Sequence, residues 1–121
     1  MSGVVKGMWC DVIDTSLEEY QPEDTECFGI WISLRVGPNG EDGAHDYQLL
    51  ICTPKWLEVK LKYEWGGAHW GRHMLIVLEY DFALIKETIA HYVERATGKD
   101  FWEVAQKVSR VAFWEFEDFQ S

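Results

Sequence analysis

Two alternating apolar segments joined by a turn constrain the fold of this chain most strongly. In residues 28–36 every second side chain is apolar, which is the period of a strand with one buried face. Residues 37–43 then combine Pro38 with three glycines and an asparagine, residue types that reverse the chain. Residues 46–52 alternate again. The pattern predicts an antiparallel hairpin whose first strand directs one row of side chains into the core: Phe28, Ile30, Ile32, Leu34 and Val36.

Two consecutive helices are expected in the C-terminal half. Residues 82–96 carry apolar side chains at steps of three and four, and Asp81 stands at the position of an N-cap. Residues 100–109 begin with Asp100 and Glu103 at the spacing of a capping box. Both segments therefore predict amphipathic helices with one buried face.

The remaining segments supply further strands and loops. Residues 4–13 predict a first strand, and residues 74–80, apolar on both faces, predict a strand in the centre of the sheet. The acidic residues 14–26 read as a surface loop. Pro54 opens a short helical turn, and residues 60–70 predict an irregular loop or an edge hairpin.

The last eleven residues, 111–121, alternate as a strand does. Trp114 and Phe116 fall on one face, whereas Glu115 and Glu117 fall on the other, about 7 Å apart. A charged outer face is common on half-buried strands, but two carboxylates at this spacing also suit a positively charged partner. The segment is expected to return the chain to the sheet.

Length and composition indicate one α+β domain covering residues 1–121. The chain is 47% apolar and 15% aromatic, which is sufficient for a single core. The elements predict a mostly antiparallel sheet of about five strands with two consecutive helices packed on one face. The opposite face would then be partly open to solvent, and an open sheet face with Trp and carboxylates is a natural docking surface.

Charge and cysteine content narrow the partners and the compartment. The chain has 21 acidic and 11 basic residues, a net charge of -10, which argues against direct nucleic-acid binding because phosphate contacts depend on Lys and Arg. No apolar stretch is long enough for a membrane helix. Cys10, Cys27 and Cys52 are odd in number and form no C-x-x-C pair, which favours free thiols in the cytoplasm.

The sequence offers little that supports catalysis, a cofactor or a metal. His69 and His73 are four residues apart, but they lead into a predicted strand, where this spacing does not align two ligands. A base at His45 would have no nucleophile near it in sequence. No phosphate-binding or nucleophile-elbow motif is present. We therefore expect a protein that is not an enzyme.

A mixture of aromatic and turn residues marks five segments of the chain: residues 28–31, 51–57, 71–77, 80–81 and 114–119. In these segments the chain resembles the immunity protein 8 family of bacterial polymorphic-toxin and contact-dependent growth inhibition systems. Phe119 departs from the resemblance, since Tyr is expected there. The resemblance implies a small cytoplasmic protein that binds and blocks a cognate toxin domain, without naming the chemistry of the toxin.

The leading hypothesis is a non-enzymatic inhibitor whose acidic, aromatic-containing surface docks on the basic cleft of a toxin, most simply a nuclease, with carboxylates in place of phosphates. An alternative is a small-ligand-binding or enzymatic domain that uses residues 63–73 as a pocket wall, and a third is a subunit of a larger assembly. The sequence leaves the toxin and the oligomeric state open. The expected contacts to the partner are Glu115, Glu117, Asp118, Asp24 and Glu26.

Overall fold

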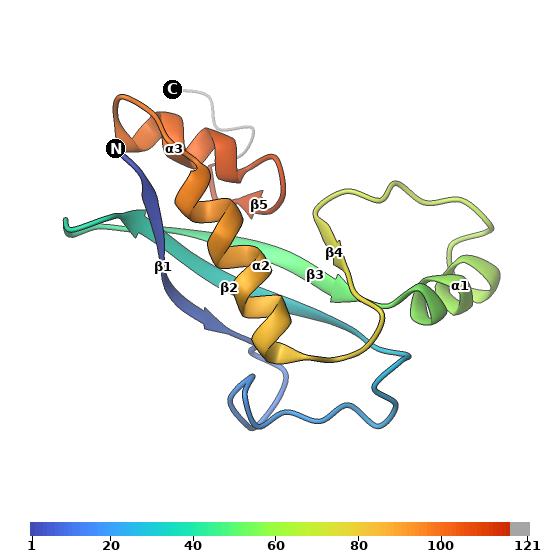
Figure 1. The fold of residues 1–121 in the computed structure, drawn as a ribbon. Coiled ribbons are helices and arrows are strands. Elements are labelled where there is room, and N and C mark those ends of the chain that lie inside the picture. The colour runs from blue at the N-terminus through green and yellow to red at the C-terminus, as the bar shows by residue number, and fades with distance from the viewer. Residues whose placement is uncertain (117–121) are drawn as a thin grey trace.

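The computed structural model describes residues 1–116 and shows an α+β fold with a mostly antiparallel sheet of five strands, as the sequence predicts. Three helices accompany the sheet (Figure 1). The elements in chain order are β1 (Gly3–Trp9), β2 (Gly29–Pro38), β3 (His45–Cys52), α1 (Pro54–Tyr63), β4 (Met74–Ile76), α2 (Phe82–Arg95), α3 (Phe101–Val108) and β5 (Phe113–Trp114).

The predicted hairpin forms the centre of the sheet. β2 and β3 pair in antiparallel register, with Ile32 opposite Leu49 and Leu34 opposite Tyr47, so the two apolar rows face the same side. β1 pairs with the outer side of β2. β3 receives both remaining strands, β4 in parallel and β5 in antiparallel orientation. The strand order is therefore β1-β2-β3-β4, with β5 also paired to β3.

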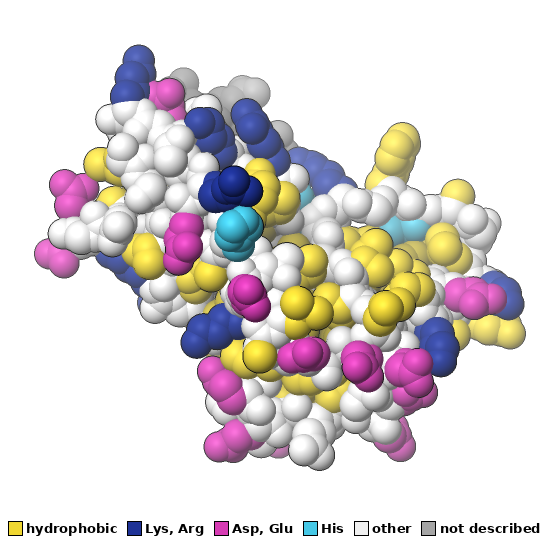
Figure 2. Space-filling model, in the orientation of Figure 1, with side chains coloured by type: hydrophobic (Ala, Val, Ile, Leu, Met, Phe, Trp, Pro, Cys, Tyr) yellow, Lys and Arg dark blue, Asp and Glu magenta, His cyan; other side chains and the backbone are white. Residues whose placement is uncertain are grey.

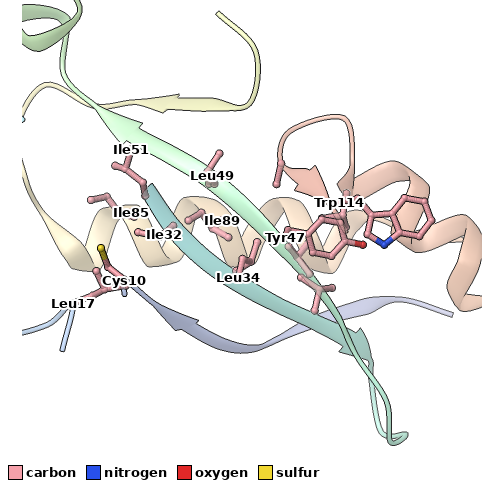
Figure 3. Packing of buried hydrophobic residues seen from close by; sticks show 14 of the residues in the cluster. Cys10, Leu17, Ile32, Leu34, Tyr47, Leu49, Ile51, Ile85, Ile89 and Trp114 are labelled. Carbon is pink, nitrogen blue, oxygen red and sulfur yellow. The ribbon is translucent and has the colours of Figure 1, made fainter. Parts of the chain in front are cut away.

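The two consecutive helices α2 and α3 cover one face of the sheet, as predicted. α2 crosses the strands and α3 follows beyond its C-terminal end (Figure 1). Ile85, Ile89 and Val93 of α2 are buried against the apolar rows of the hairpin (Figure 3). The hydroxyl of Tyr47 donates a hydrogen bond of 3.2 Å to the backbone carbonyl of Ala105, so the sheet is tied to α3 through a buried polar contact.

Side-chain caps begin all three helices. The Thr53 hydroxyl accepts from the Trp56 amide at the start of α1, and Asp81 accepts from the Leu84 amide at the start of α2. Asp100 accepts a 2.9 Å hydrogen bond from the Glu103 amide at the start of α3. Each cap satisfies a backbone donor that the first turn leaves free. The two caps expected from the sequence, at residues 81 and 100, are confirmed.

Substituting Asp100 with Ala is expected to lower the free energy of unfolding by about 1 kcal/mol, because an amide of the first turn of α3 loses its acceptor. Urea denaturation followed by circular dichroism measures the change. Asp14→Ala, in the exposed loop between β1 and β2, is the matched control. Equal losses in the two variants would contradict a capping role for Asp100.

The prediction of a central strand over residues 74–80 is wrong. β4 covers three residues, pairs with β3 alone and lies at the edge of the sheet. Ile76 is 53% exposed and Leu78 is 81% exposed, so the apolar character of both faces does not reflect burial on both faces. Part of the apolar run in residues 74–80 lies on the surface, beside the short parallel pairing of β4 with β3. Parallel strands that are far apart in sequence cannot be recognised as partners from a local sequence pattern.

The segment after β3 is more helical than predicted. α1 continues from Pro54 to Tyr63, so the expected irregular segment 60–70 loses its first residues to a helix. α1 contains no fully buried residue, and its sequence therefore lacks the apolar stripe by which helices are found. Residues 64–73 form no helix or strand, in agreement with the prediction for that part.

Both terminal strands are shorter than expected. β1 ends at Trp9 rather than at Ile13, because the chain turns away at Cys10 into the loop between β1 and β2. β5 comprises Phe113 and Trp114, and the chain then turns. Trp114 is buried and Phe116 packs partly against the core, so the predicted inner face is confirmed for these two residues.

Candidate partner-binding face

The sheet face opposite α2 and α3, called here the helix-free face, carries the residues that alternate with the core rows. Trp31, Ser33 and Arg35 stand on this side of β2, since their neighbours along the strand are buried under the helices. Their partners on β3 are Leu50, Gln48 and Asp46. The sequence predicts an open face with Trp and carboxylates, and the structure places both on this side.

An aromatic hollow of about 300 Å³ occupies the end of this face next to α1. Trp31 is 47% exposed and Trp70 is 91% exposed, whereas Leu50 beneath them is buried. Trp56 of α1 and Trp65 meet edge to face at the wall, with ring centroids 5.8 Å apart. Four tryptophans thus surround an apolar floor, an arrangement typical of binding surfaces because indole rings combine large contact area with few torsions.

Phe113 lies at the middle of the helix-free face and lines hollows on both sides of it. Its ring centroid is 5.8 Å from that of Trp31. His73 approaches the ring edge to face at 4.0 Å, and the Arg72 guanidinium lies 5.5 Å from its centroid. The Phe113 ring therefore connects the strand β5 to residues 64–73.

A second hollow, of about 310 Å³, lies on the other side of Phe113, and the carboxylates of Asp46 and Glu115 stand among the aromatic side chains of its lining. Arg35 forms a forked ion pair with Asp46, with N–O distances of 2.8 and 3.1 Å, and stacks over Trp9 at 5.1 Å. The Glu115 carboxylate accepts a 3.3 Å hydrogen bond from the Asp46 amide. Two carboxylates and one guanidinium leave this hollow with a net negative charge.

The charges of this hollow influence one another. The hydrogen bond from Arg35 lowers the pKa of the Asp46 carboxyl, and Asp46, with a smaller contribution from Glu115, raises the pKa of Arg35. Both side chains of the ion pair are more than two-fifths exposed, so solvent screens their attraction and the pair contributes little to the stability of the fold. Asp46 therefore stays ionised well into the acidic range.

The five expected contact residues do not form one cluster. Glu115 lies on the helix-free face, whereas Glu117 and Asp118 lie outside the described residues. Glu26 forms an ion pair of 3.4 Å with Lys55, and Asp24 accepts from the Glu26 amide. These two residues stand near the far end of β3, and the seven residues from Asp46 to Cys52 alone span about 20 Å. The structure thus separates Glu115 from the pair at 24 and 26.

Residues 11–26, between β1 and β2, form an acidic loop. It contains no Lys or Arg. In Figure 2, which views the molecule from the side of α2, acidic side chains gather in the lower part, where this loop lies, and basic ones gather above, towards α3. The surface charge is therefore polarised along the molecule. The exposed carboxylates of the loop are Asp11, Asp14, Glu18, Glu19, Glu23, Asp24 and Glu26.

Tyr80 fastens the acidic loop to the rest of the fold. Its hydroxyl donates a 2.7 Å hydrogen bond to the Leu17 carbonyl, and its amide donates to the Thr25 carbonyl at 2.8 Å. The rings of Tyr20 and Phe28 pack edge to face against it, each at 5.2 Å. Two backbone contacts and two ring contacts hold the loop in one conformation, which limits the ordering cost when its carboxylates meet a partner.

Burial raises the pKa of Tyr80 to about 12. A raised folded-state pKa means that the contribution to stability is full below about pH 10 and is lost as the pH rises from about 10 towards 12. Urea denaturation between pH 8 and 12 should therefore show a shallower alkaline loss for Tyr80→Phe than for the unmodified protein. Tyr63→Phe, at a position that is 79% exposed, should leave the loss unchanged. An identical pH profile for Tyr80→Phe would contradict this role.

The histidines serve packing contacts. His69 stacks on Trp65 at 3.8 Å, and Nε2 of the buried His73 lies 2.8 Å from the Ser109 carbonyl. Nδ1 of His45 accepts from the Trp114 indole N–H at 3.0 Å. Within residues 1–116 there is no group of three metal-ligating side chains placed to share an ion. In that same part of the chain, the helices are all too short or too polar to cross a bilayer.

The sequence located Glu115 but missed Phe113 as part of the face. Both residues have the same parity in the alternating C-terminal segment, opposite to Trp114. The parity rule that separates the inner from the outer face therefore places Phe113 beside Glu115. The tryptophans at 56, 65 and 70 carry no periodic signal, since they lie on a surface helix and in an irregular segment.

Comparison with known proteins identifies one family. The model of the family described as immunity protein 8 matches residues 5–119, which is nearly the whole chain. No curated protein and no solved structure gives a significant match. The matched range includes the helix-free face, the acidic loop and both C-terminal helices.

Proposed function

The chain belongs to the immunity protein 8 family, and from this we propose that it binds a cognate bacterial toxin domain with its helix-free face and blocks the toxin without catalysis. The family implies an immunity protein, and an immunity protein acts on a toxin. We propose in addition which surface binds the toxin and what kind of toxin it is.

The observation that carries this proposal is an uncovered sheet face with a half-exposed tryptophan beside a hollow. Trp31 and Phe113 touch each other, and apolar space of about 300 Å³ lies next to them. Binding energy at interfaces concentrates in central aromatic and Arg side chains that fill pockets and exclude water. A partner side chain in this hollow would be enclosed by tryptophans and would meet Arg72, while Glu115 lines the second hollow beyond Phe113.

We further propose that the toxin surface is basic, as the substrate cleft of a nuclease is. The chain carries a net charge of -10, and Glu115 and the acidic loop present carboxylates at two ends of the sheet. A field of one sign accelerates the encounter with an oppositely charged partner and weakens with added salt. Carboxylates would occupy the places that phosphates of the substrate take in the free toxin.

Reversing the charge at the C-terminal end tests the electrostatic part. Glu115→Lys combined with Glu117→Lys is expected to slow association with the toxin domain at low salt by about tenfold and to flatten its salt dependence. Stopped-flow measurements between 20 and about 300 mM salt give both quantities. Glu87→Lys with Glu94→Lys on α2 makes the same change in net charge away from the face. Unchanged rates in the first variant would rule out steering by this end.

A second candidate function is binding of a small ligand in the aromatic hollow, with residues 63–73 as its wall. The observation in its favour is that Trp65, His69 and Trp70 do line that hollow, at the small end of the size range of ligand sites. Turnover or tight binding of a small molecule by the isolated protein, abolished by His69→Ala, would favour this function. Toxin binding that survives Trp31→Ala unchanged would favour it as well.

A further inference from the structure

An apolar pit opens on the opposite side of the molecule, between α2 and the edge of the sheet formed by β3 and β4. Its volume is about 230 Å³, and apolar atoms form nearly all of its lining. Leu34 and Leu49 of the sheet and Ile89 and Val93 of α2 form its depth, and each of these side chains is at most 6% exposed. The pit thus reaches into the core, because α2 packs mainly on β1 and covers the β3 side of the sheet less closely.

Basic side chains lie beside this pit and form a rim on its side nearest the C-terminal ends of α2 and α3. An open hollow of about 570 Å³ shares Thr88 and Tyr92 with the pit and is lined by basic residues from both C-terminal helices. Figure 2 shows basic side chains gathered above this part of α2 and hydrophobic ones below it, around β4. The basic residues of the rim are His91, Arg95, Lys107 and Arg110.

No carboxylate of residues 1–116 forms an ion pair with the three permanent cations of this rim. Arg95 lies 3.3 Å from His91 Nε2, and Lys107 donates to the Thr97 carbonyl. Arg95 and Lys107 stand in the last turns of α2 and α3, where a cation complements the helix dipole, but Arg110 lies beyond the end of α3. In a chain with a net charge of -10, such a group attracts an anion locally.

From the junction of these two features we propose a binding site for an anionic amphiphile, a carboxylate on a hydrocarbon chain of medium length. The hydrocarbon chain fills the pit between Leu49 and Ile89, and the carboxylate meets the guanidinium groups of Arg95 and Arg110. A volume of about 230 Å³ suits a single hydrocarbon chain and not the face of a helix. This site is separate from the helix-free face and is independent of the toxin.

Titration of the isolated protein with decanoate tests this site. Methyl signals of Leu34, Ile89 and Val93 in NMR spectra are expected to shift in a saturable way, and decylammonium should bind at least about tenfold more weakly. Thr88→Trp, at an exposed helical position on the mouth, should block the pit without changing the core. Absence of saturable shifts below the micellar concentration, or equal binding of the two amphiphiles, would overturn the proposal.

Two charge variants complete this test. Arg95→Glu with Arg110→Glu should weaken decanoate binding by about tenfold or more, since two charge-assisted contacts are lost. Lys86→Glu with Lys99→Glu changes the net charge equally but involves residues outside the lining of both hollows. If both double variants lose the same affinity for decanoate, the net charge alone determines binding, which would contradict a specific site at the rim.

Discussion

Replacing Gly29 with Val is expected to lower the free energy of unfolding by about 2–3 kcal/mol, because an added side chain collides with the indole ring of Trp56. A Cβ atom at Gly29 would lie 2.2 Å from that ring, closer than any unstrained contact. Either the first residue of β2 moves or the Trp56 ring leaves its place against β2. Urea denaturation monitored by tryptophan fluorescence reports both the loss of stability and the displaced indole.

Gly71→Ala is the matched control for this change. A Cβ at Gly71 meets no atom within 4 Å, so the same kind of substitution adds surface without a collision. Its stability should stay within about 0.5 kcal/mol of the unmodified protein. If Gly29→Val and Gly71→Ala behave alike, the packing of Trp56 on β2 is not a determinant of the fold.

Gly29→Val also tests the link between fold and function. Trp56 lines the aromatic hollow, so its displacement should weaken toxin binding even under conditions where the variant remains folded. The expected loss is about tenfold or more, and isothermal titration at low temperature measures it. Undiminished affinity in a folded variant would show that this wall of the hollow does not take part.

The largest effect on binding is expected from Trp31→Ala and Phe113→Ala. Each should weaken the affinity for the toxin domain by about 30-fold or more, corresponding to about 2 kcal/mol. Their ring centroids lie 5.8 Å apart, and Phe113 stands between the two hollows of the helix-free face. A partner bound on this face would cover this central position completely. Surface plasmon resonance gives the affinities, and thermal denaturation verifies that the variants are folded.

Leu84→Ala provides a control with comparable exposure. Leu84 on α2 is 50% exposed, against 47% for Trp31, but it lies away from the helix-free face. Leu84→Ala therefore removes a side chain that is exposed to a similar degree, but on the other side of the molecule. A toxin affinity that falls with Leu84→Ala and not with Trp31→Ala would place the interface on the helix side.

The hairpin and the two C-terminal helices were predictable because their signals are local. Period-2 alternation specified β2 and β3, and the capping residues Asp81 and Asp100 specified where α2 and α3 begin. By contrast, β4 depends on a parallel pairing with a strand that precedes it by more than twenty residues, and α1 has no buried stripe. Those two elements are determined by tertiary contacts that no local window contains.

The candidate site was predictable in part. An open sheet face followed from the expectation of helices on one side, and Glu115 followed from strand parity. The hollow did not, because it requires Trp56, Trp65 and Trp70 to come together from a surface helix and an irregular segment onto the end of the sheet. Aromatic content alone indicates binding surface without saying where the rings meet.

The helix-free face is where we propose that the toxin binds. We expect the neighbouring reading frame to encode the partner, as the C-terminal toxin domain of a large secreted protein. Amide NMR signals of the protein, followed during titration with that catalytically inactivated toxin domain, test the claim most directly. Shifts are expected to concentrate on Trp31, Gln48 and Phe113 and to spare the outer side of α2. Shifts confined to α2 and α3, with the helix-free face unchanged, would contradict the claim.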